Sequence, residues 1–247
     1  MFKAKLINKF IFTLLVLIAS LPVSSADTVL TITSGRGEPF VNDKQNGFYD
    51  LIVKNMFKRI NIKAKTVLLP SERSLINANT GVDDGNIARI KGIEKKYTNL
   101  VMIPGKIIDF DFVAFTKNKK YKVKNWESLK LYNVAFINGW KLFEKKVKYH
   151  KSLVRTQNFS QLLELLNNGR ADIALYDLWS GVWWMKYQAR KTNIQYLKPP
   201  IASYQLYLYL NKKHIKLVPR LSSALASMKN DGTYQRIYEQ TLNVLLK

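Results

Sequence analysis

The side chains best suited to chemistry in this chain are two arginines, one aspartate, one asparagine and two aromatic rings, each placed after a run of strand-forming residues. In chain order they are Phe40, Arg73, Arg89, Asn138, Trp140 and Asp177. A guanidinium group binds a carboxylate through paired hydrogen bonds, and an aspartate accepts hydrogen bonds from an ammonium group. With aromatic walls beside them, these groups suit a small zwitterion. We therefore expect the six residues to form a ligand-binding site.

The elements that must position these residues are strands and helices in alternation. Runs of β-branched and apolar residues predict strands at 28–33, 62–69, 86–88, 100–103, 110–116, 131–137, 171–176 and 203–210. Apolar residues at helical spacing, with capping and stop residues, predict helices at 47–60, 71–78, 159–166, 178–189, 218–228 and 234–246. Such alternation predicts an α/β fold with largely parallel sheets.

The candidate residues follow the strand ends, where ligands bind in open α/β sheets. The predicted elements also divide the chain into two parts: a lysine-rich turn at 117–120 follows one long strand, and the strand at 203–210 returns the chain to the first part. We therefore expect two lobes joined by two crossings. Residues 27–116 and 202–247 are predicted to form lobe 1, and residues 117–201 lobe 2.

Each candidate also has a purely structural interpretation. Phe40 and Trp140 are suited to core packing, and Arg73 and Arg89 to a solvated surface. Asp177 directly precedes the predicted helix at 178–189 and suits its N-cap, a role compatible with ligand contact. A further aromatic stripe has helical spacing, which favours core or lobe packing over a ligand cage. It consists of Trp179, Trp183, Trp184 and Tyr187.

Composition excludes several classes of protein. The chain has 247 residues, of which 47% are hydrophobic and 23% charged, as in a folded globular protein. Disorder, collagen-like repeats and a small disulfide scaffold are excluded. Because the chain has no cysteine, disulfides, thiolate metal sites, cysteine nucleophiles and lipidated cysteines are excluded as well.

Residues 1–26 have the pattern of a secretory signal peptide. Lys3, Lys5 and Lys9 give a basic start, a short apolar run covers residues 10–21, and small residues follow at 24–26. A membrane anchor is the alternative, but the run ends before the length needed to span a bilayer. We expect cleavage after Ala26 and a periplasmic, non-lipidated protein.

The net charge of +23 raises the hypothesis of a polyanionic partner. Without the three lysines of residues 1–26 the charge is still +20. The other lysines are spread widely, with groups at 117–124, 141–151 and 212–216, and no nucleic-acid-binding motif accompanies them. We therefore predict no nucleic-acid partner, and interpret the charge as solvated surface or attraction to an anionic membrane face or acidic permease loops.

Catalysis has few candidate residues. The two histidines, His150 and His214, lie beside lysines in stretches typical of surface, and no metalloprotease, nucleophile-elbow or P-loop motif occurs. Glu72 with Asp177 is the carboxylate pair best suited to acid–base work, although sequence alone does not bring them together. We predict a protein that is not an enzyme and holds no cofactor or metal.

Three segments carry a resemblance to a known family. They are Gly47-Phe48-Tyr49-Asp50-Leu51, the stretch from Leu165 to Asp177, and the stretch from Leu225 to Tyr234. In this order they resemble the helix entry, the helix–Gly–Arg–Ala–Asp–strand–Asp segment and the closing helix of bacterial periplasmic solute-binding protein family 3. This is the polar-amino-acid type of ABC transporter binding protein. The resemblance covers essentially all of residues 27–247.

The resemblance implies a type II periplasmic-binding-protein clamp, monomeric, that takes a small amino-acid-like solute and hands it to an inner-membrane permease. By this likeness Asp177 binds an α-ammonium group. The family's Thr-x-x-Arg pattern is absent at the corresponding residues 92–95, so Arg89 or Arg73 takes its place. Two alternatives are a ligand-sensing partner of a membrane signalling receptor and a secreted dehydratase-like enzyme on the same fold.

Overall fold

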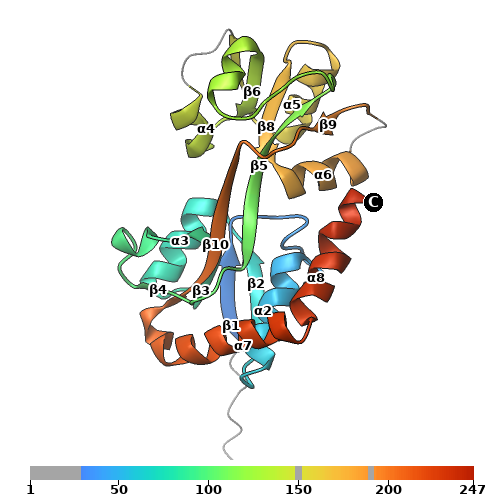
Figure 1. The fold of residues 1–247 in the computed structure, drawn as a ribbon. Coiled ribbons are helices and arrows are strands. Elements are labelled where there is room, and N and C mark those ends of the chain that lie inside the picture. Colours follow the sequence, from blue (N-terminus) through green and yellow to red (C-terminus); the bar gives the residue numbers. More distant parts are fainter. Residues whose placement is uncertain (1–28, 148–151, 189–191) are drawn as a thin grey trace, which may run out of the picture.

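Two lobes connected by a pair of long strands make up the molecule. The structure is a computed structural model that describes residues 29–147, 152–188 and 192–247. Figure 1 shows the lobes one above the other, with β5 (Ile108–Thr116) and β10 (Ala202–Asn211) running from one to the other. The predicted signal peptide and His150 lie outside the described residues.

Lobe 1 is built on three parallel strands. It contains β1 (Leu30–Ser34), β2 (Ala64–Leu68), β3 (Gly85–Ile90), β4 (Leu100–Met102), α2 (Phe48–Lys58), α3 (Ser71–Thr80), α7 (Val218–Asn230) and α8 (Thr233–Thr241). Strand β1 lies between β2 and β3, parallel to both, and β10 pairs antiparallel with β3 and β4. Short 3-10 helices complete this lobe: η1 (Ile93–Lys95), η3 (Lys212–Leu217) and η4 (Asn243–Leu246).

Lobe 2 repeats this plan with different strands. It contains η2 (Glu127–Leu131), β6 (Asn133–Ile137), α4 (Lys141–Lys146), β7 (Ser152–Thr156), α5 (Phe159–Asn167), β8 (Ile173–Asp177), α6 (Leu178–Tyr187) and β9 (Gln195–Tyr196). Strand β6 lies parallel to β7 and β8, while β5 pairs antiparallel with β8 and β9.

The two crossing strands join the lobes into one continuous sheet. Residues 202–206 of β10 pair antiparallel with 108–112 of β5, so the strand order is β2-β1-β3-β10-β5-β8-β6-β7. The predicted α/β class with two lobes is confirmed, and each lobe is a parallel set closed by an antiparallel crossing strand. The residues at which the lobes divide, 116/117 and 201/202, stay a prediction.

The loop between β1 and α2 is held in place by the side chain of Asp50, in the first turn of α2. The Asp50 carboxylate accepts hydrogen bonds from the backbone N–H of Gly47 at 2.9 Å and of Asn42 at 3.1 Å. A Cβ atom at Gly47 would lie 2.4 Å from the carbonyl oxygen of Phe40, so only glycine permits this close approach. The end of the loop next to α2 is therefore fixed, and this restricts the conformations of the residues that directly follow β1.

Helix α6 makes a second contact between the lobes. Its Trp179 ring meets the Tyr238 ring of α8 edge-on at 5.7 Å, and the Lys186 ammonium donates to the Val244 carbonyl at 2.8 Å. In Figure 1 this helix lies beside the C-terminal end of the chain. One side of the space between the lobes is therefore bridged by α6. None of the helices in the described ranges is long and apolar enough to cross a membrane.

Asp84 ties the edge of lobe 1 to η3 and provides a pH-dependent term in stability. Its carboxylate accepts from the Thr31 backbone N–H at 2.9 Å, and lies 2.8 Å from the Lys213 ammonium and 2.7 Å from His214 Nε2. Burial acts to raise the pKa of Asp84, but these donors outweigh it and hold the pKa below its usual value.

We expect Asp84→Asn to lower the free energy of unfolding by about 1–2 kcal/mol at pH 7, because a charged acceptor is lost. A depressed pKa stabilises the fold above the unfolded value near pH 4, and this gain disappears as the pH falls through the folded pKa. The difference between the two proteins in urea unfolding should thus shrink below about pH 4. The exposed Asp43 supplies the control, since Asp43→Asn should change little at either pH. A deficit in the Asp84 variant that is equal at pH 3 and pH 7 would contradict this assignment.

Candidate functional site

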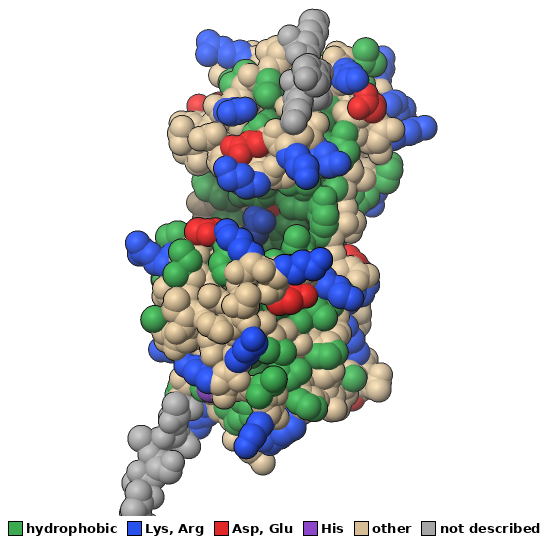
Figure 2. Space-filling model, turned by 90° about the vertical axis from the view of Figure 1, so that its left-hand side faces the viewer, with side chains coloured by type: hydrophobic (Ala, Val, Ile, Leu, Met, Phe, Trp, Pro, Cys, Tyr) green, Lys and Arg blue, Asp and Glu red, His purple; other side chains and the backbone are tan. Residues whose placement is uncertain are grey.

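A cavity of about 700 Å³ lies between the two lobes. Lobe 1 lines it with residues 35–38 and Ser71, and lobe 2 with residues 139–142, Tyr176 and the first turns of α6; Phe112 of β5 lies between them. Figure 2 shows the hollow, walled by hydrophobic side chains with a Lys or Arg side chain in its depth. Both lobes thus contribute to one binding space.

Strand ends position the residues of this cavity. Arg36 follows β1, Ser71 follows β2, Trp140 follows β6, and Asp177 is the last residue of β8. Because β1 and β2 are parallel, as are β6 and β8, each lobe presents the carboxyl ends of its strands on the side that faces the other lobe. The site therefore lies where the rule for open α/β sheets places it.

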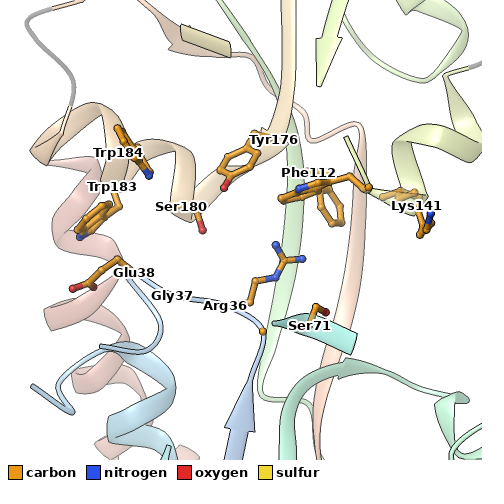
Figure 3. A pocket seen from close by; sticks show the side chains of 14 residues that line it. Arg36, Gly37, Glu38, Ser71, Phe112, Lys141, Tyr176, Ser180, Trp183 and Trp184 are labelled. Atoms are coloured by element: carbon orange, nitrogen blue, oxygen red, sulfur yellow. The ribbon is translucent and has the colours of Figure 1, made fainter. Parts of the chain in front are cut away.

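Arg36 is the central charged group of the cavity. Its guanidinium carbon lies 4.8 Å from the ring centre of Phe110 and 4.8 Å from that of Trp140, within cation–π range of both. One guanidinium nitrogen is 3.9 Å from Oδ2 of Asp177, and the Arg36 side chain is 31% exposed. In Figure 3 the guanidinium points from lobe 1 up into the cavity. Arg36 therefore links the two lobes electrostatically while remaining accessible to a solute.

Asp177 lies behind Arg36 as the N-cap of α6. Its Oδ1 accepts from the backbone N–H of Ser180 at 2.9 Å, whereas Oδ2 is buried with no hydrogen-bond partner among the described residues. Burial raises the pKa of Asp177, and the Arg36 charge and the Ser180 N–H counteract that rise. The side chain is only 1% exposed, so Arg36 is the counter-charge of a sealed carboxylate.

Aromatic rings form the walls on both sides of Arg36. The Trp140 ring stacks on Phe143 at 5.4 Å and meets Phe112 edge-on at 5.9 Å, so packing fixes its orientation. At the opposite end Trp183 and Trp184 of α6 line the cavity. Figure 3 places these two rings on one side of Arg36 and Phe112 on the other. Flat or apolar parts of a solute would find contact surfaces at both ends.

The structure places the six sequence-predicted residues at different distances from this cavity. Trp140 lines it, and Asp177 lies beneath it, in contact with Arg36. The predicted N-cap role of Asp177 is confirmed. Asn138 is exposed and precedes the lining residues by one position, and Arg73 is exposed on α3. Ligand contact by each of the six stays a prediction.

Phe40 and Arg89 are engaged with protein groups. Phe40 is fully buried and stacks on Tyr49 at 4.6 Å. The Arg89 guanidinium donates to the hydroxyl of Ser71 at 3.0 Å and to its carbonyl at 2.9 Å, and also bonds Ser74 and Asn86. Burial and the neighbouring Arg36 charge lower the pKa of Arg89 to about 10. Arg89 thus holds the first turn of α3 in place beside the cavity.

Several lining residues were not among the sequence candidates. They are Arg36, Ser71, Phe112, Tyr176, Ser180, Trp183 and Trp184. For Arg36 the signal was available, because it lies in the same turn after β1 as Phe40. The residues of the aromatic stripe have two different environments. Trp179 is buried and packs on Tyr238, as the packing interpretation expected. Trp183 and Trp184 instead line the cavity. Within the described ranges, no cluster of three or more His, Cys, Asp or Glu side chains is suited to a metal ion.

Comparison with known proteins places this geometry in a structural class. No protein-family model matches the chain. An uncharacterized protein of Shewanella oneidensis is 23% identical over 244 aligned residues, covering 88% of this chain and 84% of that protein. A putative binding component of an ABC transporter from Wolinella succinogenes, complexed with lysine, superposes with a TM-score of 0.69 at 19% identity. That match covers 86% of this chain and 95% of the other. The chain has a periplasmic-binding-protein fold.

Two further structures with this fold have different roles. A histidine kinase sensor domain similar to periplasmic binding proteins matches with a TM-score of 0.69 at 18% identity, over 87% of this chain and 96% of its own. An ancestral amino-acid-binding protein, a precursor of cyclohexadienyl dehydratase, matches with a TM-score of 0.66 at 19% identity, over 87% and 95%. The two-lobed fold implied by the sequence resemblance is thereby confirmed.

Proposed function

We propose that the chain is a periplasmic solute-binding protein of family 3. In this role it takes up a small polar, carboxylate-bearing solute between its lobes and delivers it to an ABC-type permease. The observation that carries the proposal is the Arg36 guanidinium, which projects into a cavity of about 700 Å³ lined by both lobes. Paired hydrogen bonds from a guanidinium are a strong and directional way to bind a carboxylate. Amino-acid-binding proteins with the same fold support this class of solute.

Binding and lobe closure are coupled in this proposal. The strands β5 and β10 are the two covalent connections, and small changes along them reorient one lobe against the other. A solute that touches Arg36 of lobe 1 and Trp140 of lobe 2 has more contacts when the lobes are closed. Its higher affinity for the closed form shifts the population toward that form, which the permease then recognises.

A signalling receptor is the alternative partner. The likeness to a histidine kinase sensor domain favours it, since the same closure can be read by a receptor instead of a permease. Co-purification of a membrane partner from cells that export the chain separates the two. A permease partner supports transport, and a kinase partner supports sensing.

Binding fits the side chains better than catalysis does. Asp177 is sealed behind Arg36, and Glu72 accepts from the Tyr97 hydroxyl at 2.9 Å on the exposed face of α3. His214 is paired with Asp84 on η3. The carboxylate pair considered for acid–base work thus has its members engaged separately. We infer a binding protein, and turnover assays with prephenate-like acids test the dehydratase alternative.

Thermal unfolding with a panel of amino acids, carboxylic acids, small peptides and polyamines tests the binding proposal. At a hundred times its Kd, a solute should add about 2.7 kcal/mol of stability and raise the Tm by about 5–10 °C. We expect at least one carboxylate-bearing compound to do so, and polyamines to have no effect. A panel without any shift would contradict solute binding for these classes.

A further inference from the structure

The groups that surround Arg36 include several hydroxyls that can donate hydrogen bonds. The hydroxyls of Tyr176 and Ser180 point into the cavity from lobe 2, as Figure 3 shows, and Ser71 lines it as well. Lys141 also lines the cavity, but its ammonium is paired with Glu144 at 3.1 Å. Burial raises the pKa of Tyr176, so its hydroxyl keeps its proton. Serine and tyrosine hydroxyls and a guanidinium can all donate to an anion. The centre of the cavity therefore suits a negatively charged group.

The two carboxylates of this region are poorly placed for a solute ammonium. Oδ2 of Asp177 is inaccessible and faces the Arg36 guanidinium at 3.9 Å, and Oδ1 already accepts from Ser180. Glu38 accepts from the Asn42 side chain at 3.1 Å, and in Figure 3 its carboxylate points away from Arg36, on the Trp183 side of the cavity. A cation next to Arg36 would thus meet like charge without an accessible counter-charge.

Arg36 itself holds the position that a solute cation would need. Its guanidinium lies 4.8 Å from each of two ring centres, those of Phe110 and Trp140, and faces Asp177. A buried carboxylate flanked by aromatic rings is a typical cation site, and here the protein's own side chain fills it. The Arg36 charge lies close enough to Arg89 to help lower the pKa of Arg89, so the two guanidinium groups repel each other. An anion between these groups would relieve that repulsion.

We propose that the solute is an organic carboxylate without an α-ammonium group, whose flat apolar body packs between the Trp140 and Trp184 ends of the cavity. The inference rests on the proposed binding function and specifies its substrate class. Arg36, Ser71 and the hydroxyls of lobe 2 bind the carboxylate. The aromatic walls contact the body, while Asp177 stays covered behind Arg36 and does not touch the solute.

Calorimetric titration with matched pairs tests this class. The pairs are 3-phenylpropanoate with L-phenylalanine, indole-3-propanoate with L-tryptophan, and glutarate with L-glutamate. Each pair differs by the α-ammonium group alone. We expect an aromatic acid to bind at least about tenfold more tightly than its amino acid, as one unmatched charge predicts, and more tightly than glutarate. Equal or tighter binding of the amino acids would overturn the inference while leaving solute binding intact.

The variant Asp177→Asn gives a second readout. It keeps an acceptor for the Ser180 N–H and removes the negative charge behind Arg36. The affinity for the aromatic acids should stay unchanged or rise. A tenfold loss of affinity for the amino acids, with no loss for the aromatic acids, would indicate direct contact of Asp177 with a solute ammonium and overturn the inference. If no member of any pair binds, the substrate class is wrong. The binding function itself fails only when the wider thermal-unfolding panel also gives no shift.

Discussion

Arg36→Gln should weaken solute binding by about tenfold to a hundredfold, the loss expected when a charge-assisted hydrogen bond to a carboxylate is removed. Arg36 is the guanidinium that lines the cavity, and Gln offers one amide in place of the planar fork. Isothermal titration with the tightest compound of the panel measures the loss.

The matched control for this variant is Arg73→Gln. Arg73 lies exposed on α3 and does not line the cavity, so its removal subtracts the same charge from the same lobe. The affinity of this control should equal that of the unchanged protein within about twofold, as for surface sites away from a contact. An equal loss in both variants would mean that overall charge attracts the solute. Undiminished binding by Arg36→Gln would remove Arg36 from the site.

The same Arg36→Gln variant should lose stability as the pH rises. Burial raises the pKa of Asp177 and Arg36 counteracts this, so deleting Arg36 raises that pKa further. A folded pKa above the unfolded value, near 4, means that the folded state binds the proton more tightly. Stability then falls as the pH rises from about 4 through the folded pKa. At pH 7 we expect the free energy of unfolding of Arg36→Gln to be about 1–3 kcal/mol lower than that of the unchanged protein. The loss is smaller than for breaking a fully buried ion pair, because Arg36 is partly exposed.

Urea unfolding at pH 4 and pH 7 measures this deficit. The double variant Arg36→Gln, Asp177→Asn supplies the control, because it removes the unpaired charge and retains an acceptor for the Ser180 N–H of α6. At pH 7 the double variant should regain the free energy of unfolding that Arg36→Gln loses. Between pH 4 and pH 7 its free energy of unfolding should not fall more steeply than that of the unchanged protein. A deficit that is independent of pH, or that Asp177→Asn does not repair, would show that Asp177 and Arg36 are not coupled.

The regular elements could largely be predicted because their signals are local. Asn158 caps the start of α5 by accepting a hydrogen bond from the Gln161 N–H. Asp177 caps α6 by accepting from the Ser180 N–H. The types and positions of both residues indicated these caps. Weaker signals were missed. Helix α4 is a six-residue turn with four charged residues, and β7 has a half-exposed pattern without an apolar run. The last predicted helix at 234–246 is wrong as one piece, because α8 ends at Thr241 and η4 follows.

The site was predictable at the level of strand ends but not of side-chain direction. The turn after β1 holds both Arg36 and Phe40, and sequence cannot show which side chain enters the cavity. Phe40 packs beneath Tyr49, whereas Arg36 points to lobe 2. Arg89 was expected to follow the third strand, but β3 extends to Ile90 and includes it, and its guanidinium donates to Ser71 and Ser74. These outcomes depend on tertiary packing, which the spacing of residues along the chain does not encode.

The most direct test is a crystal structure of the natively purified protein, or of a complex with the tightest compound from the titrations. We predict a solute between the lobes whose carboxylate oxygens lie within hydrogen-bond distance of the Arg36 guanidinium, with Asp177 still covered. A solute that sits elsewhere, or one whose ammonium contacts Asp177 after Arg36 has left the cavity, would contradict the account.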